Sequence, residues 1–151
     1  MSSLLPGKVL ALDLGDVWIG IAISDALWMV ARPLETVTLS HLESHLQKLL
    51  QKERIATIVV GCPITCGGTR SAQTEKIELQ CAELAKSFPQ VEWRLWDERL
   101  SSKRAEQLQS SKKKSKQKGA KQESHAIAAA FILDSFLQNH QAKKSLEELE
   151  N

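Results

Sequence analysis

Hydrophobic positions near the start of the chain form two apolar runs that are separated by a short polar break. The runs cover 9–12 and 19–23, and Gly15 lies in the break between them. Apolar runs of this length, bounded by turn residues, are typical of buried strands. Residues 28–39 alternate weakly and contain Pro33, which a sheet tolerates at its edge. We therefore expect three consecutive antiparallel strands.

The next segment changes to a helical period. Leucines recur at helical spacing at Leu42, Leu46, Leu49 and Leu50. Ser40 and Glu43 have the spacing of a capping box, which predicts a helix from Ser40 to about Arg54. The apolar segment 55–60 has no alternation, which indicates a strand that helices cover on both faces.

The second half of the chain repeats this change of period. We expect helices over 71–87 and 124–139, a strand over 91–96, and a short helix to about residue 108. The pattern predicts an α/β fold with a five-stranded mixed sheet, made of an antiparallel meander of three strands and two further strands, with helices on both faces.

Length and composition indicate one soluble domain. The chain has 151 residues, of which 42% are hydrophobic and 25% charged, as in ordinary globular proteins. We see neither an apolar run long enough for a membrane span nor a signal segment, so we expect a cytoplasmic protein with no membrane partner. We expect a single domain over 1–140, a mobile Lys-rich loop at about 110–121, and a polar tail over 141–151 that is frayed or exposed.

Carboxylates lie at two predicted strand ends. Asp13 follows an apolar run, and Asp97 and Glu98 follow the last strand. A buried carboxylate is costly unless a cation compensates it, and strand ends at one edge of an α/β sheet converge. Two carboxylates around Mg²⁺ or Mn²⁺ are typical of metal-assisted phosphodiester hydrolysis.

Several motifs resemble the YqgF (RuvX) family when they are taken together and in order. Those proteins are bacterial, have a ribonuclease H-like fold, and are described as Holliday junction resolvases and as nucleases that mature the 5′ end of pre-16S ribosomal RNA. The similarity extends from about residue 9 to residue 137. The motifs are Ala-Leu-Asp-Leu-Gly, Ile-Gly-Ile-Ala-Ile-Ser-Asp, Val-Val-Gly-Cys-Pro with Gly-Gly-Thr, Asp-Glu-Arg-Leu-Ser-Ser and Ala-Ile-Ala-Ala-Ala-Phe-Ile-Leu.

The resemblance implies a catalytic metal site at Asp13 and Glu98. Asp97 is less suited, because adjacent residues of an extended chain point to opposite faces. The family usually has a third acid, an Asp, at the start of the last helix, and that position is His125 here. Three possibilities stay open. His125 completes the site, which favours Mn²⁺ over Mg²⁺, or His125 only packs beside the site, or Glu123 just upstream supplies the missing carboxylate.

The resemblance also implies a nucleic-acid partner, either structured RNA or branched DNA. We expect phosphate contacts from basic residues in three segments, namely Arg70, Arg99, Lys112, Lys113, Lys114 and Lys116. Trp18 replaces an Arg that is common in the family, so one such contact is in doubt. The leading hypothesis is a nuclease for pre-16S ribosomal RNA, acting as a monomer or homodimer. The alternatives are a Holliday junction resolvase-like endonuclease and a binding protein with impaired catalysis.

Overall fold

The computed structural model describes residues 7–63, 71–97 and 120–150, with the backbone alone for 120–123. Its elements, in chain order, are β1 (Lys8–Leu14), β2 (Trp18–Ser24), β3 (Ala31–Thr38), the 3₁₀ helix η1 (Leu39–His41), α1 (Leu42–Lys52), β4 (Ile55–Cys62), α2 (Ala72–Ser87), β5 (Glu92–Asp97) and α4 (Ala120–Glu150). The helix expected over 101–108 and most of the Lys-rich loop fall outside the described residues.

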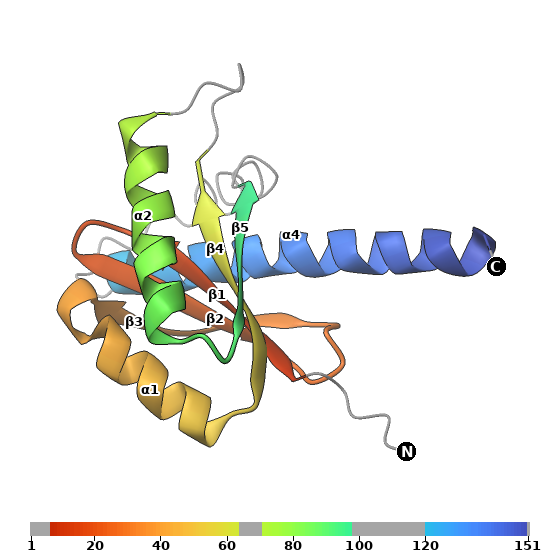
Figure 1. Ribbon diagram of the computed structural model, residues 1–151, viewed down its shortest axis with the longest axis horizontal. Coiled ribbons are helices and arrows are strands. Elements are labelled where there is room, and N and C mark those ends of the chain that lie inside the picture. The colour runs from red at the N-terminus through yellow and green to blue at the C-terminus, as the bar shows by residue number, and fades with distance from the viewer. Residues whose placement is uncertain (1–6, 64–70, 98–119, 151) are drawn as a thin grey trace.

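The five strands form one mixed sheet in the order β3-β2-β1-β4-β5. The pairs β1/β2 and β2/β3 are antiparallel, whereas β1/β4 and β4/β5 are parallel. Helices α1 and α2 cover one face of the sheet and α4 crosses the other (Figure 1). This arrangement confirms the predicted meander, the two added strands and the helices on both faces.

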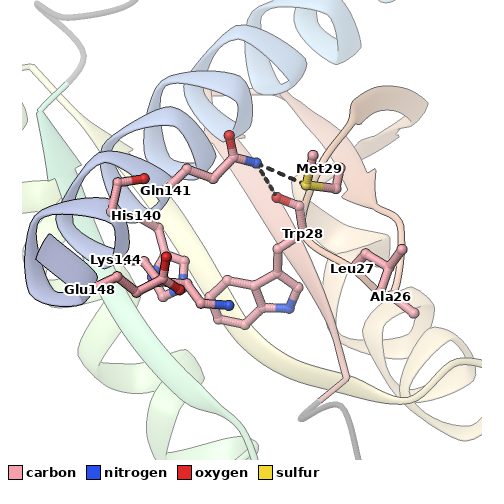
Figure 2. Close-up of a pocket in the computed structure, with 9 residues that line it drawn as sticks. Ala26, Leu27, Trp28, Met29, His140, Gln141, Lys144 and Glu148 are labelled. Atoms are coloured by element: carbon pink, nitrogen blue, oxygen red, sulfur yellow. Dashed lines mark hydrogen bonds between the residues drawn. The ribbon is translucent and has the colours of Figure 1, made fainter. Parts of the chain in front are cut away.

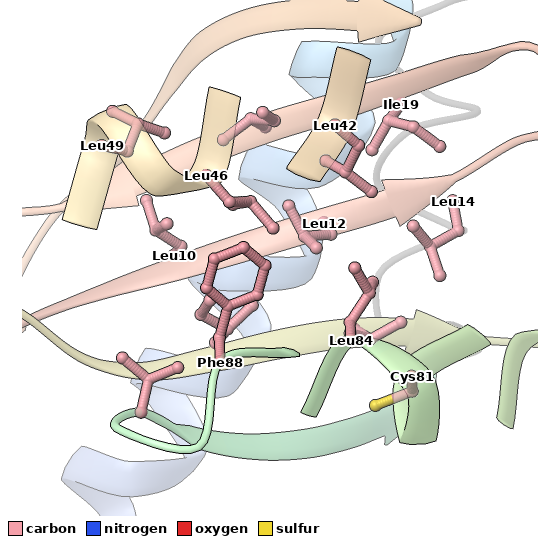
Figure 3. Close-up of a cluster of buried hydrophobic side chains, with 14 of the residues drawn as sticks. Leu10, Leu12, Leu14, Ile19, Leu42, Leu46, Leu49, Cys81, Leu84 and Phe88 are labelled. Carbon is pink, nitrogen blue, oxygen red and sulfur yellow. The ribbon is translucent and has the colours of Figure 1, made fainter. Parts of the chain in front are cut away.

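Two apolar cores lie on the two faces of the sheet. The core under α1 and α2 includes Leu10, Leu12 and Leu14 of β1 (Figure 3). The core under α4 includes Val9 and Ala11 of the same strand. Because side chains alternate along a strand, Asp13 lies on the same face as Val9 and Ala11, which is the face that α4 covers.

The β2–β3 turn shortens the third strand relative to its predicted start at residue 28. The Asp25 carboxylate accepts hydrogen bonds from the backbone N–H groups of Leu27, Met29 and Val30, at 3.3, 2.8 and 2.8 Å. Amides that donate to a side chain in a turn do not pair in a ladder. The strand consequently begins at Ala31, with Trp28 in the left-handed region at φ 59°.

Two predicted helix ends are wrong. Residues Leu39–His41 form η1, so α1 begins at Leu42 with His41 as its N-cap and no side-chain capping bond. The Ser40 hydroxyl instead lies 3.2 Å from Oγ1 of Thr38. The last helix does not end at Asn139 but continues to Glu150, because the segment after it lacks Gly and Pro and consists mainly of good helix formers.

The tail is exposed, as predicted, from residue 142 to the end of the described chain, although it is helical. The division into a domain over 1–140 and a separate tail stays a prediction. Among the described residues, no helix has both the length and the apolar composition needed to span a membrane.

Candidate active site

Asp13 lies near the end of β1, between β2 and β4. Across the antiparallel pair it faces Gly20 of β2, and its side chain is 22% exposed. The neighbouring residues Leu12 and Leu14 are buried in the opposite core. The carboxylate is therefore held at a strand end that is shielded on one side by the sheet and open on the other.

Gly20 allows the backbone of α4 to rest directly on the sheet beside Asp13. A Cβ atom on Gly20 would lie 1.9 Å from the carbonyl oxygen of His125 and 2.2 Å from its carbonyl carbon. Contacts under 3.0 Å cannot form without a backbone shift. A side chain at this position would therefore lift the helix, and the glycine sets the height of α4 above Asp13.

This role of Gly20 is not evident from the sequence motifs. The available signal was a glycine inside an apolar strand, which often marks the close approach of another backbone. A glycine in a strand does not by itself identify which backbone approaches it. The approach of His125 to Gly20 depends on where α4 crosses the sheet.

The structure brings the side chains of His125 and Asp13 close together. Nδ1 of His125 lies 3.6 Å from Oδ2 of Asp13, and the His125 side chain is 32% exposed. This separation is too long for a hydrogen bond. A Cβ atom on Gly15 would lie 3.6 Å from Cε1 of His125, so the imidazole stands between Asp13 and the β1–β2 turn.

The donor atoms fit a shared divalent metal ion. Two ligands that each lie about 2.1 Å from one ion are separated by about 3.0–3.6 Å at angles of roughly 90–120°. The 3.6 Å between Nδ1 of His125 and Oδ2 of Asp13 falls in this range. Within the described residues no group of three or more His, Cys, Asp or Glu side chains could hold a metal ion.

Strand β5 lies at the edge of the sheet and is separated from β1 by β4. Trp96 packs against Phe136 of α4 with ring centroids 5.4 Å apart, and its Nε1 donates to Ser135. Trp93 packs in the opposite core, and by strand alternation Asp97 belongs to that face. The arrangement agrees with the expectation that Asp97 is a poor ligand for a metal bound at Asp13.

The remaining predicted site residues lie outside the described structure. They are Glu98, Arg70, Arg99, Lys112, Lys113, Lys114 and Lys116, together with the side chain of the alternative ligand Glu123. Their assignment stays a prediction. Cys62 at the end of β4 is buried in the core under α1 and α2, away from the face that carries Asp13.

Comparison with known proteins identifies the family of the chain. Residues 7–139 match the family model described as "RuvX: Holliday junction resolvase". A protein of Rubrobacter xylanophilus named as a candidate pre-16S rRNA nuclease is 35% identical over 132 residues, covering 87% of this chain and 93% of the relative. A protein of the same name from Halalkalibacterium halodurans is 36% identical over 141 residues, covering 90% and 99%.

A solved structure confirms the fold. Thermus thermophilus RuvC, in complex with a Holliday junction substrate, superposes with a TM-score of 0.52 at 14% identity, covering 89% of this chain and 95% of RuvC. The fold is therefore ribonuclease H-like, as the resemblance implied. With the family match over most of its length and relatives above 30% identity, the chain belongs to the RuvX family.

Proposed function

We propose that this protein is a metal-dependent nuclease that hydrolyses phosphodiester bonds during 5′ end maturation of pre-16S ribosomal RNA. Its family membership makes it a hydrolase of the nuclease class. The RNA substrate is inferred from the names of its relatives. The observation that carries the proposal is the meeting of Asp13 and His125 at one end of the sheet, at a separation suited to two ligands of one ion.

Asp13, Glu98 and His125 would hold the Mg²⁺ or Mn²⁺ ion. Glu98 is included because the resemblance to the family places its second acid there, in the Asp-Glu-Arg-Leu motif. Asp97 has the parity of Trp93, which packs in the core on the face opposite Asp13. A bound ion would supply Lewis-acid stabilisation of the phosphate and an activated water. The metal preference is expected to shift toward Mn²⁺, because an imidazole is a softer ligand than the carboxylate usual in the family.

The fold itself positions two of the proposed ligands, independently of a bound metal. The strand fixes Asp13, and the Gly20 contact fixes the backbone of His125. Orientation of catalytic groups to within about 1 Å is worth roughly 100-fold in rate. Arg70, Arg99, Lys112, Lys113, Lys114 and Lys116 are proposed to bind the substrate's phosphates in a salt-sensitive manner. We place the protein in the cytoplasm.

Two other functions have an observation in their favour. The family description favours a Holliday junction substrate. His125 in place of the family's acid favours a nucleic-acid-binding protein with impaired catalysis, because one negative charge is missing from the site. These alternatives are distinguished by substrate and by metal response.

The test is a cleavage assay on a pre-16S RNA substrate and on a four-way DNA junction, each with Mg²⁺ or Mn²⁺. We expect RNA cleavage, and we expect Asp13→Asn to lower its rate at least about 100-fold, as for loss of a metal ligand. Asp16→Asn is the matched control, because the Asp16 side chain is 88% exposed and pairs with Lys76 at the surface. Cleavage that survives Asp13→Asn would refute the assigned site, and cleavage of the junction alone would refute the RNA substrate.

A further inference from the structure

Most large apolar side chains that the described part of the chain leaves exposed lie in two segments, the β2–β3 turn and the last turns of α4. Five of the nine lie in the β2–β3 turn or in the last turns of α4, with exposed fractions between 59% and 82%. They are Leu27, Met29, Val30, Leu146 and Leu149. Clusters of exposed apolar side chains mark interaction surfaces more often than scattered ones do.

Helix α4 is much longer than the sheet that it crosses. Its 31 residues span about 46 Å at 1.5 Å per residue, whereas β1, with seven residues, spans about 23 Å. Figure 1 shows the C-terminal turns extending past the end of the sheet. Every residue from 142 to 150 is exposed, so these turns lack the packing that normally stabilises a helix.

The projecting turns carry an apolar stripe with charges along one flank. Ala142, Leu146 and Leu149 are spaced i, i+4 and i+7, which places them on one side of the helix. Lys143, Glu147 and Glu150 each follow a member of this stripe, so they share one flank. The flank is basic at its start and acidic at its end.

We propose that a second copy of this chain covers this surface, with the last turns of the two α4 helices packed antiparallel about a two-fold axis near Leu146. The antiparallel arrangement brings Lys143 of each copy beside Glu150 of the other. A parallel pair would place like charges together. The surface is therefore complementary to itself, as a two-fold symmetric interface requires, and the leucines of both copies become buried.

A groove lies along another side of the projecting turns, away from the stripe of Ala142, Leu146 and Leu149. It has a volume of about 450 Å³ and lies between the β2–β3 turn and α4, with Trp28, His140 and Lys144 among its lining residues (Figure 2). Gln141 Nε2 donates to the carbonyl oxygen of Trp28 at 3.1 Å, which ties the turn to the helix.

The proposed interface is small, so we expect a dimer that dissociates on dilution. A standard interface buries about 800 Å² on each partner, and fewer than three helical turns offer less than that. Sedimentation velocity of the full chain between about 1 and 200 μM should show a shift from monomer to dimer, as for a micromolar dissociation constant. A wild-type chain that stays monomeric throughout overturns the proposal and leaves the surface to a different partner.

The first variant tests the leucines. Leu146→Glu combined with Leu149→Glu should be monomeric at every concentration, because four carboxylates would meet in the contact. Leu79→Glu is the matched control, since Leu79 is 68% exposed on α2 and lies outside the proposed surface. Circular dichroism checks that the helix content is kept. Unchanged dimerisation of the double variant overturns the proposal.

The second set of variants tests the antiparallel arrangement. This test remains informative even if the leucine variant loses helix content. Lys143→Glu gives a flank that is acidic throughout, and Glu147→Lys with Glu150→Lys gives one that is basic throughout. Each should dimerise several-fold more weakly alone, while an equimolar mixture should regain dimer by opposite-charge pairing. A mixture that stays monomeric where the wild-type chain dimerises overturns the antiparallel arrangement.

Discussion

Substituting Gly20 by alanine should show how closely the active-site geometry depends on one missing side chain. The new Cβ atom would lie 1.9 Å from the carbonyl oxygen of His125. Ordinary van der Waals contact begins near 3.4 Å, so the strand and the helix must separate by about 1.5 Å, the difference between these two distances. The position of the new Cβ atom is fixed by the strand backbone, and the carbonyl that it meets belongs to the helix backbone. No side-chain rotation can therefore relieve the contact.

Two effects of opposite sign then compete in the free energy of unfolding. Alanine is favoured over glycine inside a strand by about 0.5–1 kcal/mol. Overpacking in a well-packed region costs about 1–3 kcal/mol and occasionally more. A displacement of this size belongs to the upper part of that range, so we expect a net destabilisation of about 2 kcal/mol, which is about 1 M in the urea midpoint.

The assay is urea unfolding followed by circular dichroism, together with the cleavage rate and Mn²⁺ affinity measured by calorimetry. Because Asp13 and His125 are moved apart, the rate should fall about 100-fold and the affinity should fall with it. His125→Ala is the companion variant. The clash is with the backbone of residue 125, so Gly20→Ala should cost the same in both backgrounds, within about 0.5 kcal/mol. A Gly20→Ala protein as stable as the wild type would refute the reasoning.

Three further predictions concern single groups. His125→Asp should raise Mg²⁺-supported cleavage relative to Mn²⁺-supported cleavage, measured as the ratio of the two rates. The hydrogen bond from the Val30 backbone N–H holds the pKa of the Asp25 carboxyl below its ordinary value, so ionised Asp25 stabilises the fold above its unfolded-state pKa. The stability difference between wild type and Asp25→Asn should shrink in urea melts as the pH falls through the lowered folded-state value. Burial, and secondarily the neighbouring Cys62, raises the pKa of the Cys81 thiol, so a thiol reagent should leave Cys81 unmodified in the native protein at pH 8 and modify it in urea.

The sequence predicts the parts of this fold that depend on local pattern. Alternation along β1 separates Leu12 from Asp13, and the structure places them on opposite faces. The helical spacing in the last helix likewise places Leu133 in the core under α4. Both results follow because burial of apolar side chains dominates the stability of these elements.

The parts that the sequence does not predict depend on competing local bonds or on distant segments. Ser40 has the residue type and spacing of an N-cap, but η1 occupies its position. Asp25 draws three turn amides away from the ladder. The polarity of the tail correctly indicates that residues 142–150 are exposed. It does not predict that the helix continues, which depends on helix propensity and on the absence of helix breakers. The 3.6 Å between Asp13 and His125 requires the sheet register and the helix height together.

Helix α4 connects the two proposals of function and assembly while keeping them separable. His125 and Leu146 are 21 residues apart, about 32 Å along the helix at 1.5 Å per residue. Between them Ala129, Leu133 and Leu137 are almost fully buried against the sheet, which fixes the helix at its middle. A substitution in the projecting turns should therefore leave the position of His125 unchanged. The monomeric Leu146→Glu and Leu149→Glu variant should consequently keep the wild-type rate on a substrate that needs one cut, and lose rate only where two cuts must be coordinated by two joined sites.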